Sequence, residues 1–334
     1  MIVTNKPKYK AFLSQQENVH EILSEGLDFI NWKKIIENND HVFVKPNFTF
    51  PCYKKGVTTS PVLLNNLLTF LSDRASQVTL IESNGGNNIF TADEAFRGHE
   101  MEKICKELGV EMINLTKEPT EYVSENVCGK RVKVEIPKLL RTQVDKFVSV
   151  PVLKIHAMTS ISITMKNLWG CYPDPMRCLY HDNLDRKLTL LTKLWSPSIC
   201  VLDGLYALDG HGPLFGTPVN MNILSVVNNP VVADALAARI MGFIPRTIDH
   251  IRMAEDFGLG STNPGDVMFN TEWKSLCHPF SFGRTVLDYL SLLPFHSSLL
   301  AKIIFQSPFT GIIRKAVDFF RTSEEKTDLR SYIL

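Results

Sequence analysis

Five residues in the middle third of this 334-residue chain are of types that carry acid–base chemistry. They are Lys154, His156, Lys166, His181 and His211. A lysine holds a phosphate or carboxylate as a point charge, and when desolvated it offers an amine for a Schiff base. Histidine accepts or donates a proton near neutral pH. We interpret the five as catalytic candidates; for the two lysines, solvation at the surface is the alternative.

A second set of residues follows short apolar segments, where strands are expected to give way to loops. In an open α/β sheet, ligands bind outside the carboxyl ends of the strands. Glycine lets backbone N–H groups approach an anion closely, and the hydroxyl-rich segment 159–164 is predicted to form an oxyanion cradle. The predicted substrate-binding residues are Lys45, Asn47, Ser83, Asn84, Gly85, Gly86, Asn167 and Gly212.

Carboxylates close to a histidine raise the alternative of a divalent metal ion, because imidazole nitrogen and carboxylate oxygen are common metal ligands. The predicted ligands are Glu82, Asp203, Asp209 and His211, although their spacing matches no established zinc motif. Asp203 is expected at the carboxyl end of a strand. Turn chemistry is the alternative explanation for the glycine-rich segment 209–213.

Other cofactors have no signature in this sequence. Neither the Gly-x-Gly-x-x-Gly dinucleotide fingerprint nor the P-loop lysine motif of ATP-binding proteins follows the early strands. The seven cysteines include no Cys-x-x-Cys pair, so a ferredoxin-type cluster is not expected. Cys171 and Cys178 lie beside the polar centre, and they are either ligands or nucleophiles of a redox site or ordinary small buried residues.

Composition narrows the class of protein. A net charge of +1 gives no indication of nucleic-acid binding, which usually comes with a basic surplus. The polar segment 1–20 does not resemble a signal peptide, and no apolar run is long enough to span a bilayer. Together with the cysteine pattern, these features predict a cytoplasmic protein with reduced thiols.

The apolar segments predict an α/β fold with a mostly parallel sheet and flanking helices. Strands are expected at 42–44, 78–81, 110–115, 147–150, 199–202 and 219–227. Helices are expected at 60–71, with Ser60 as its cap, at 91–108, and after Pro230. Strand–helix repetition of this kind builds βαβ units with buried parallel strands.

The domain prediction is an α/β core over 1–278, as one body or two lobes, followed by a helical C-terminal extension over 279–334. Within the core, 117–141 is expected to form a hairpin excursion because its residues alternate between apolar and charged. Segment 280–320 mixes apolar and basic residues in an amphipathic pattern. It either packs on the core or a second subunit, or makes a peripheral contact with a membrane or protein partner. The oligomeric state is left open.

Several of these segments together resemble the family catalogued as domain of unknown function 362. The resemblance spans about 42–260 and rests on Val44 to Asn47, Glu82 to Gly86, Pro151 to His156, Met165 to Gly170, Val201 to Gly204, Gly212-Pro213 and Ala233 to Ala235. It implies a cytoplasmic α/β protein and supplies no reaction. Some relatives carry ferredoxin-like cysteine clusters, which this chain lacks.

Three functional hypotheses follow. The first is an enzyme of small-molecule metabolism that acts on a small anionic metabolite by lysine and histidine acid–base chemistry, with or without a divalent metal ion. The second is a redox protein that holds a metal or iron–sulfur centre with a separate partner. The third is a non-catalytic ligand-binding scaffold whose C-terminal segment contacts a membrane or a protein.

Overall fold

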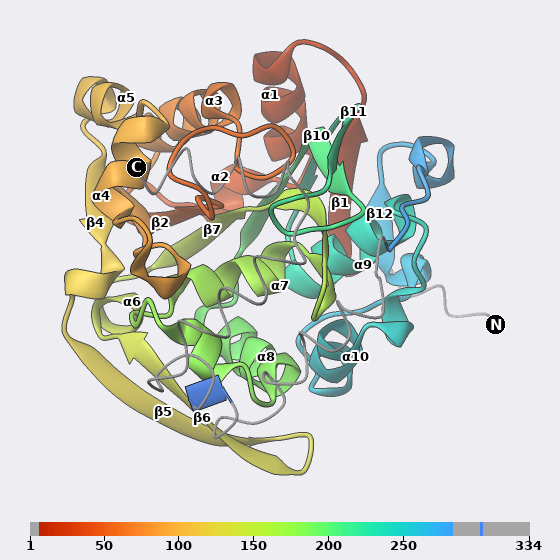
Figure 1. Ribbon diagram of the computed structural model, residues 1–334. Coiled ribbons are helices and arrows are strands. Elements are labelled where there is room, and N and C mark those ends of the chain that lie inside the picture. Colours follow the sequence, from red (N-terminus) through yellow and green to blue (C-terminus); the bar gives the residue numbers. More distant parts are fainter. Residues whose placement is uncertain (1–6, 283–300, 303–334) are drawn as a thin grey trace.

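Short apolar segments alternate with helices along the chain, and they assemble into one mixed sheet covered by helices (Figure 1). The computed structural model describes residues 7–282 and 301–302. The strands are β1 (Tyr9–Ser14), β2 (His41–Pro46), β3 (Gln77–Glu82), β4 (Glu111–Asn114), β5 (Thr120–Val127), β6 (Lys130–Pro137), β7 (Lys146–Val150), β8 (Val152–His156), β9 (Ser160–Ser162), β10 (Ile199–Asp209), β11 (Thr217–Val227) and β12 (Val267–Phe269). The α-helices are α1 (Val19–Phe29), α2 (Trp32–Ile35), α3 (Pro61–Ser72), α4 (Ala92–Gly98), α5 (Met101–Leu108), α6 (Leu139–Thr142), α7 (Thr164–Asn167), α8 (Leu184–Trp195), α9 (Pro230–Ile240) and α10 (Asp249–Asp256).

The main sheet is mostly parallel at its centre. Its strand order is β12-β1-β11-β10-β7-β2-β3-β4, and β8 and β9 are attached beside β10. The five neighbours β10, β7, β2, β3 and β4 run parallel, whereas β11 is antiparallel to both β10 and β1. The α/β fold with a mostly parallel sheet, predicted from the sequence, is confirmed.

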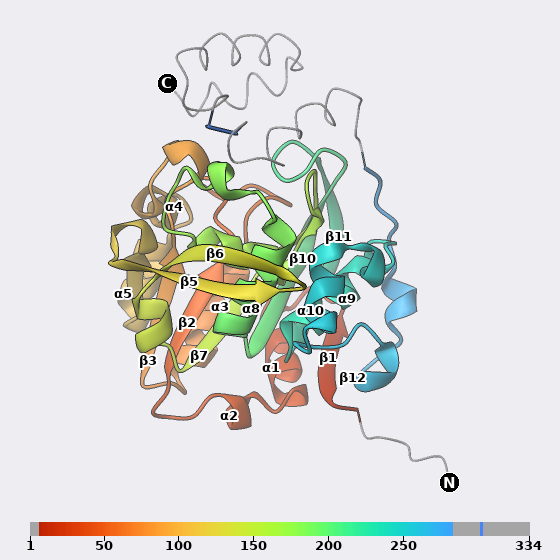
Figure 2. The same cartoon turned by 90° about the horizontal axis from the view of Figure 1, so that it is seen from below.

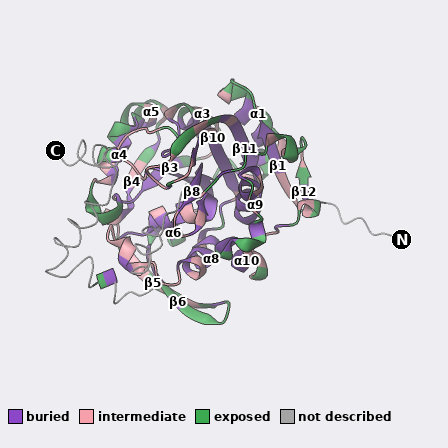
Figure 3. Cartoon of the chain, turned by 45° about the vertical axis from the view of Figure 1, so that its right-hand side comes forward, coloured by how far each residue is buried: buried purple, intermediate pink, exposed green. Residues whose placement is uncertain are grey.

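Helices cover both faces of the sheet, because alternate side chains of each buried strand point to opposite sides. On β2, Val42 and Val44 pack with α1, α3 and α5, whereas Phe43 packs with α8 and the β5–β6 hairpin. Helices α9 and α10 cover the second face over β1, β10 and β11. The arrangement is visible in Figure 2, and Figure 3 shows the buried strands between the partly exposed helices.

The excursion predicted at 117–141 contains a hairpin. Strands β5 and β6 pair antiparallel as a two-stranded sheet separate from the main one. On β6, Val132, Val134 and Ile136 are buried, and they belong to the same apolar cluster as α8. The alternating pattern therefore predicted this element correctly.

The helix predicted over 91–108 is wrong as a single element. It is two helices, α4 and α5, and Glu100 between them adopts the left-handed conformation with φ 62°. At the end of α4, Gly98 packs closely on a distant segment, since an added Cβ there would lie 2.0 Å from the carbonyl oxygen of Pro51. Thr91 caps α4 through a capping box, and Gly109 ends α5 in the left-handed conformation.

The prediction for the C-terminal segment can be compared with the structure at only a few residues. The helical extension over 279–334, including the amphipathic segment 280–320, falls almost entirely outside the described residues. Within the described part of the chain, no helix combines the length and the apolar character needed to cross a bilayer.

Candidate functional site

The candidate site lies where the chain reverses its direction of travel through the sheet. From β2 the chain moves outward to β3 and β4, and β7 then returns to the opposite side of β2 and leads on to β10. Loops after two such neighbouring strands leave in opposite directions, and ligands of open α/β sheets bind in the resulting crevice. Lys45 and Glu82 end β2 and β3, and Lys154 lies just beyond the end of β7.

A buried ion pair joins the ends of β2 and β3. The Nζ atom of Lys45 lies 2.7 Å from Oε2 of Glu82, and both side chains are almost completely buried. The same Lys45 Nζ donates to the carbonyl of Pro46, while Glu82 accepts backbone N–H groups from Phe48 and Ser83. Removing either charge would leave the other buried and unpaired, which typically costs about 3–5 kcal/mol.

Gly170 allows the turn after α7 to pack directly on this ion pair. A Cβ at Gly170 would lie 2.8 Å from Lys45 Nζ and 3.2 Å from Glu82 Oε1. Asn167, one helical turn earlier, donates to the carbonyl of Lys45 and to Oγ of Ser149. Asn167 therefore ties β2 to β7 at the crevice, and in this structure its amide nitrogen serves the protein scaffold.

Lys154 is the second buried cation. Its Nζ donates to Oδ1 of Asn47 at 3.2 Å and to the carbonyl of Val57 at 2.8 Å, and its side chain is 1 % exposed. Burial and the nearby positive charges of Lys166 and Lys45 lower the pKa of Lys154 well below its ordinary value. Lys154 thus contacts Asn47, another of the residues predicted for the site.

His156 follows Lys154 by two residues on β8, so both side chains lie on the same side of that strand. Its Nδ1 accepts backbone N–H groups from Met158 at 3.1 Å and Thr159 at 3.4 Å. In the neutral ring, Nε2 therefore carries the proton and is the donor. Burial and the charge of Lys166 lower the pKa of His156 well below its usual value, so the ring is neutral at pH 7.

Lys166, Arg177 and His181 are partly exposed and complete the group. Burial and the charge of Arg177 lower the pKa of Lys166 to about 7. Arg177 donates to the carbonyl of Asn84 at 2.9 Å. The ring of His181 packs on Trp169 at 5.7 Å between centroids, and burial together with the charge of Lys166 lowers its pKa well below the usual value. We call Lys45, Lys154, Lys166 and Arg177 the cationic cluster.

Asp234, which no motif marked as functional, holds the helical turn that carries Lys166. Its two carboxylate oxygens accept the backbone N–H groups of Thr164 and Met165, at 2.8 and 3.1 Å. Burial raises the pKa of Asp234 to about 6. His250 lies beyond it, 3.8 Å from Asp234 and 3.4 Å from Asp185. The hydroxyl-rich segment 159–164, which was expected to form an oxyanion cradle, contains strand β9 and the first residue of α7.

Asp203 occupies a different position from the one expected. Strand β10 does not end there but continues to Asp209, with an irregularity after Gly204. The Asp203 carboxylate accepts the backbone N–H of Ser60 at 2.7 Å, at the start of α3, and of Leu205 at 3.2 Å. Ser60 makes no side-chain cap of its own, so Asp203 supplies the acceptor there. Burial raises the pKa of Asp203 to about 6.

The four predicted metal ligands are engaged separately. Glu82 is paired with Lys45, Asp203 binds the start of α3, and Asp209 accepts the N–H groups of Gly210 and Ser281. His211 is exposed. Across the described ranges 7–282 and 301–302, no three His, Cys, Asp or Glu side chains are grouped as a metal ion would require. These residues, as arranged, do not fit one shared ion.

The predicted substrate-binding residues in the two glycine-containing segments also lie in different surroundings. Ser83 and Gly85 are buried, whereas Gly86 is exposed. Asn84 lies nearest the cluster, since its carbonyl accepts from Arg177. Gly212 is pressed against β8, where an added Cβ would lie 1.9 Å from the carbonyl oxygen of Ile155. Close packing with a strand, and not an approach to a ligand, explains glycine at that position.

Two cysteines adjoin the cluster without acquiring thiolate character. Cys171 is buried, and burial raises the pKa of its thiol to about 12. Burial also raises the pKa of Cys178, whose Sγ contacts Oδ1 of Asn87 at 3.2 Å. Both thiols are protonated at neutral pH, which is unfavourable for a nucleophile.

Arg177 was not anticipated from the sequence. It lies in a 3-10 turn (Arg177–Tyr180), and the only sequence signal was its position between Cys171 and the Tyr180-His181-Asp182 segment. An isolated arginine of this kind is indistinguishable from a surface residue until the fold places it beside Lys166.

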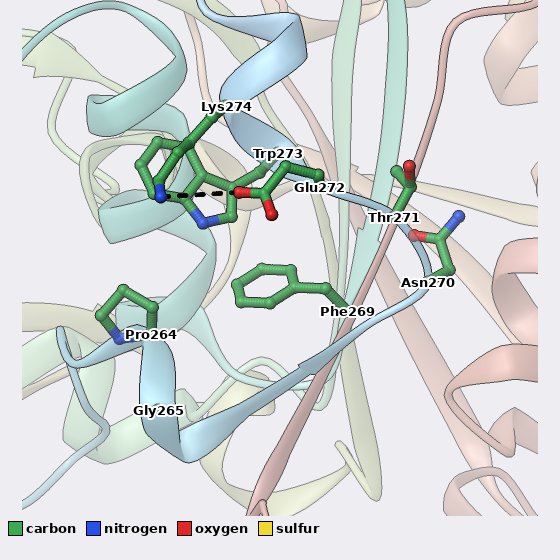
Figure 4. Close-up of a pocket in the computed structure, with 8 residues that line it drawn as sticks. All are labelled: Pro264, Gly265, Phe269, Asn270, Thr271, Glu272, Trp273 and Lys274. Carbon is green, nitrogen blue, oxygen red and sulfur yellow. Dashed lines mark ion pairs between the residues drawn. The ribbon is translucent and has the colours of Figure 1, made fainter.

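A separate surface pocket of about 470 Å³ lies beside β12 (Figure 4). Its lining consists of Pro264, Gly265, Phe269, Asn270, Thr271, Glu272, Trp273 and Lys274. The Lys274–Glu272 ion pair there, at 3.8 Å, joins two largely exposed side chains and contributes little to the stability of the fold. None of the predicted site residues lines this pocket, so the cationic cluster is the better candidate.

Comparison with known proteins shows the family of this chain. The family model described as a domain of unknown function (DUF362) matches residues 42–239. The chain belongs to this family. The DUF362 match includes the whole cationic cluster, together with Glu82, His156 and His181.

Two individual proteins show partial similarity. A thylakoid-associated protein of Synechocystis sp. is 29% identical over 125 residues, covering 35% of this chain and 39% of that protein. The chain thus matches less than half of that relative's length. A crystal structure of a protein from Thermotoga maritima aligns with a TM-score of 0.36 and 10% identity over 71% of this chain and 59% of that one, which is too distant to inform fold or function.

Proposed function

We propose that this chain is an enzyme that binds a small anionic metabolite at the cationic cluster and transfers a proton on it. The observation that carries the proposal is the charge balance of the site. Four cationic side chains gather there, and within the described residues only Glu82 is ion-paired with any of them, while the charge of Asp185 also acts on Lys166. Buried charge without a partner is costly, so an anion would offset the excess.

The side chains divide into binding and proton-transfer roles. Arg177 offers a planar donor group suited to a carboxylate or phosphate, whereas Lys154 holds Asn47 and the carbonyl of Val57 in place. Lys166, with a pKa of about 7, is a neutral amine for part of the time at physiological pH and is suited to act as the base. His156 donates from Nε2, which suits stabilisation of an oxyanion formed when a proton is removed next to a carbonyl group.

Anion binding is tested by thermal unfolding in the presence of phosphate, glycolate, malonate and chloride. A ligand at a hundred times its Kd stabilises the folded state by about 2.7 kcal/mol. For a chain of 334 residues that corresponds to a rise in Tm of roughly 4 °C. Arg177→Gln is expected to remove the effect, whereas the exposed control Lys103→Gln on α5 is expected to retain it.

Proton transfer is tested separately by NMR. A panel of 2-oxo and 2-hydroxy acids is incubated with the protein in D2O, and loss of the signal of the C–H next to the carbonyl or carboxylate is followed. Exchange that depends on Lys166 supports the enzyme. Anions that stabilise the protein without any exchange would instead leave a binding protein.

Localisation is proposed on a separate basis. We propose a cytoplasmic protein that contacts a membrane surface peripherally. Support comes from the basic and apolar sequence of 280–320 and from a relative whose name describes it as thylakoid-associated. Co-sedimentation of the full chain with anionic vesicles should fall at high salt. Absence of binding to anionic vesicles at low salt would refute the proposal.

A further inference from the structure

The three lysines of the cationic cluster differ in what their Nζ atoms contact. Lys45 is committed to Glu82 and to the carbonyl of Pro46. Lys154 is committed to Asn47 and to the carbonyl of Val57. The Nζ of Lys166 makes no hydrogen bond or ion pair with any residue in the described part of the chain, and its side chain is partly exposed.

The backbone beneath Lys166 is nevertheless firmly held. Asp234 accepts the first two N–H groups of α7, and Asn167 anchors the end of the same turn to β2 and β7. A cationic neighbour, Arg177, acts on Lys166 from a different segment. An amine that is fixed at its base, has no partner at its tip among the described residues and is acted on more strongly by Arg177 than by Asp185 has the properties of a covalent nucleophile.

We propose that Lys166 forms a Schiff base with the carbonyl group of a small aldehyde or ketone that also carries a carboxylate or phosphate. This inference rests on the proposed function, because the anionic group of the same molecule would be bound by Arg177. It deepens that function by naming the substrate class, an anionic carbonyl compound, and by giving Lys166 the role of nucleophile, so that the imine, and not the free amine acting as a base, activates the adjacent C–H bond of such a substrate.

The step is balanced without a further reactant. The lone pair of neutral Lys166 Nζ attacks the carbonyl carbon, and the carbonyl π-electrons move to oxygen to form a carbinolamine after proton transfer from nitrogen to oxygen. The second proton of the amine nitrogen then passes to the hydroxyl oxygen, the C–O bond breaks and the oxygen leaves as water, and the nitrogen lone pair forms the C=N bond. The N–H donor of His156 is suited to stabilise the developing oxyanion, and positive charge in the cluster disfavours protonation of Lys166 before the attack.

The test uses glyoxylate with sodium cyanoborohydride at pH 7, followed by peptide mass spectrometry. Hydride from the borohydride reduces the imine carbon and leaves a stable carboxymethyl group on the lysine nitrogen. We expect Lys166 to be modified at least about tenfold faster than the exposed control Lys103, since an ordinary lysine is almost fully protonated at this pH.

Two variants and a non-carbonyl anion separate the possible results. Lys166→Arg keeps a positive charge but has no nucleophilic amine, so it should bind glycolate and form no adduct. Stabilisation by glycolate combined with modification of Lys166 no faster than of Lys103 would overturn the Schiff-base inference and leave the anion site intact. Absence of stabilisation by glycolate, glyoxylate and phosphate alike would overturn the proposed function, and this inference with it.

Discussion

Replacing Arg177 by glutamine should raise the pKa of Lys166, because the charge of Arg177 is the largest electrostatic influence on that amine after burial. With a pKa of about 7, half of Lys166 is neutral at pH 7. An ordinary lysine with a pKa of about 10.4 is neutral in roughly one molecule in 2,500 at that pH. The lower basicity of Lys166 weakens it as a nucleophile, so its reaction rate should exceed that of an exposed lysine by about tenfold to a hundredfold.

Loss of one charge interaction in a partly buried site is worth about 1.4 kcal/mol, or about one pH unit. In Arg177→Gln the midpoint of Lys166 should therefore move to about 8, and its neutral fraction at pH 7 should fall from about one half to about one tenth. The assay is competitive acylation with a trace of reagent from pH 5.5 to 10, read for each lysine by peptide mass spectrometry.

Lys103 serves as the internal control in the same digests, because it is exposed on α5, so its acylation should not differ between the two proteins. A circular dichroism spectrum establishes that Arg177→Gln is folded. The reasoning would be refuted if Lys166 titrates together with Lys103 in the wild type, or if its midpoint is the same with and without Arg177.

Three further outcomes follow from the same structure. Between about pH 7 and pH 10 the unfolded chain binds more protons at position 166 than the folded one, so the free energy of unfolding should rise with pH. In urea titrations, Lys166→Met should flatten this rise. An unchanged dependence of the free energy of unfolding on pH would contradict the lowered pKa of Lys166. Gly170→Ala places a Cβ 2.8 Å from the buried Nζ of Lys45 and should lower the free energy of unfolding by about 1–3 kcal/mol. Gly86 has open space around it, so Gly86→Ala should change the free energy of unfolding by no more than about 0.5 kcal/mol. Equal effects of the two substitutions would disprove the close packing at Gly170. Iodoacetamide at pH 8 should alkylate the exposed Cys128 in the native protein and should not alkylate Cys171, because burial raises the pKa of that thiol to about 12. Rapid alkylation of Cys171 would favour the redox hypothesis instead.

The strands were largely predictable because a buried parallel strand is a short apolar run bounded by turn residues. Segment 78–81 lies within β3, and 147–150 lies within β7. The boundaries that failed depend on contacts between distant parts of the chain. Where 91–108 divides into two helices, Gly98 packs against the backbone of distant Pro51, and β10 pairs with β11 as far as Asp209.

The residue types of the site were also apparent in the sequence. Lys45, Lys154, His156, Lys166 and His181 were all predicted, because lysines and histidines next to apolar strands are unusual unless they serve a site. Their roles were not apparent, since a role depends on the partner of each atom. Glu82 and Asp203 were grouped as metal ligands, yet one is paired with a lysine and the other binds the start of a helix.

By itself, the sequence determined the α/β class, the parallel strands and the presence of basic residues where those strands end, because strand and helix periodicity and the residues that terminate strands are local properties of the chain. Only the tertiary structure decided that Arg177 joins Lys166, that Asp234 holds the turn beneath it, and that His211 lies at the surface. Charge interactions and burial depend on distance in space, and residues separated by tens of positions acquire those distances only when the sheet has formed.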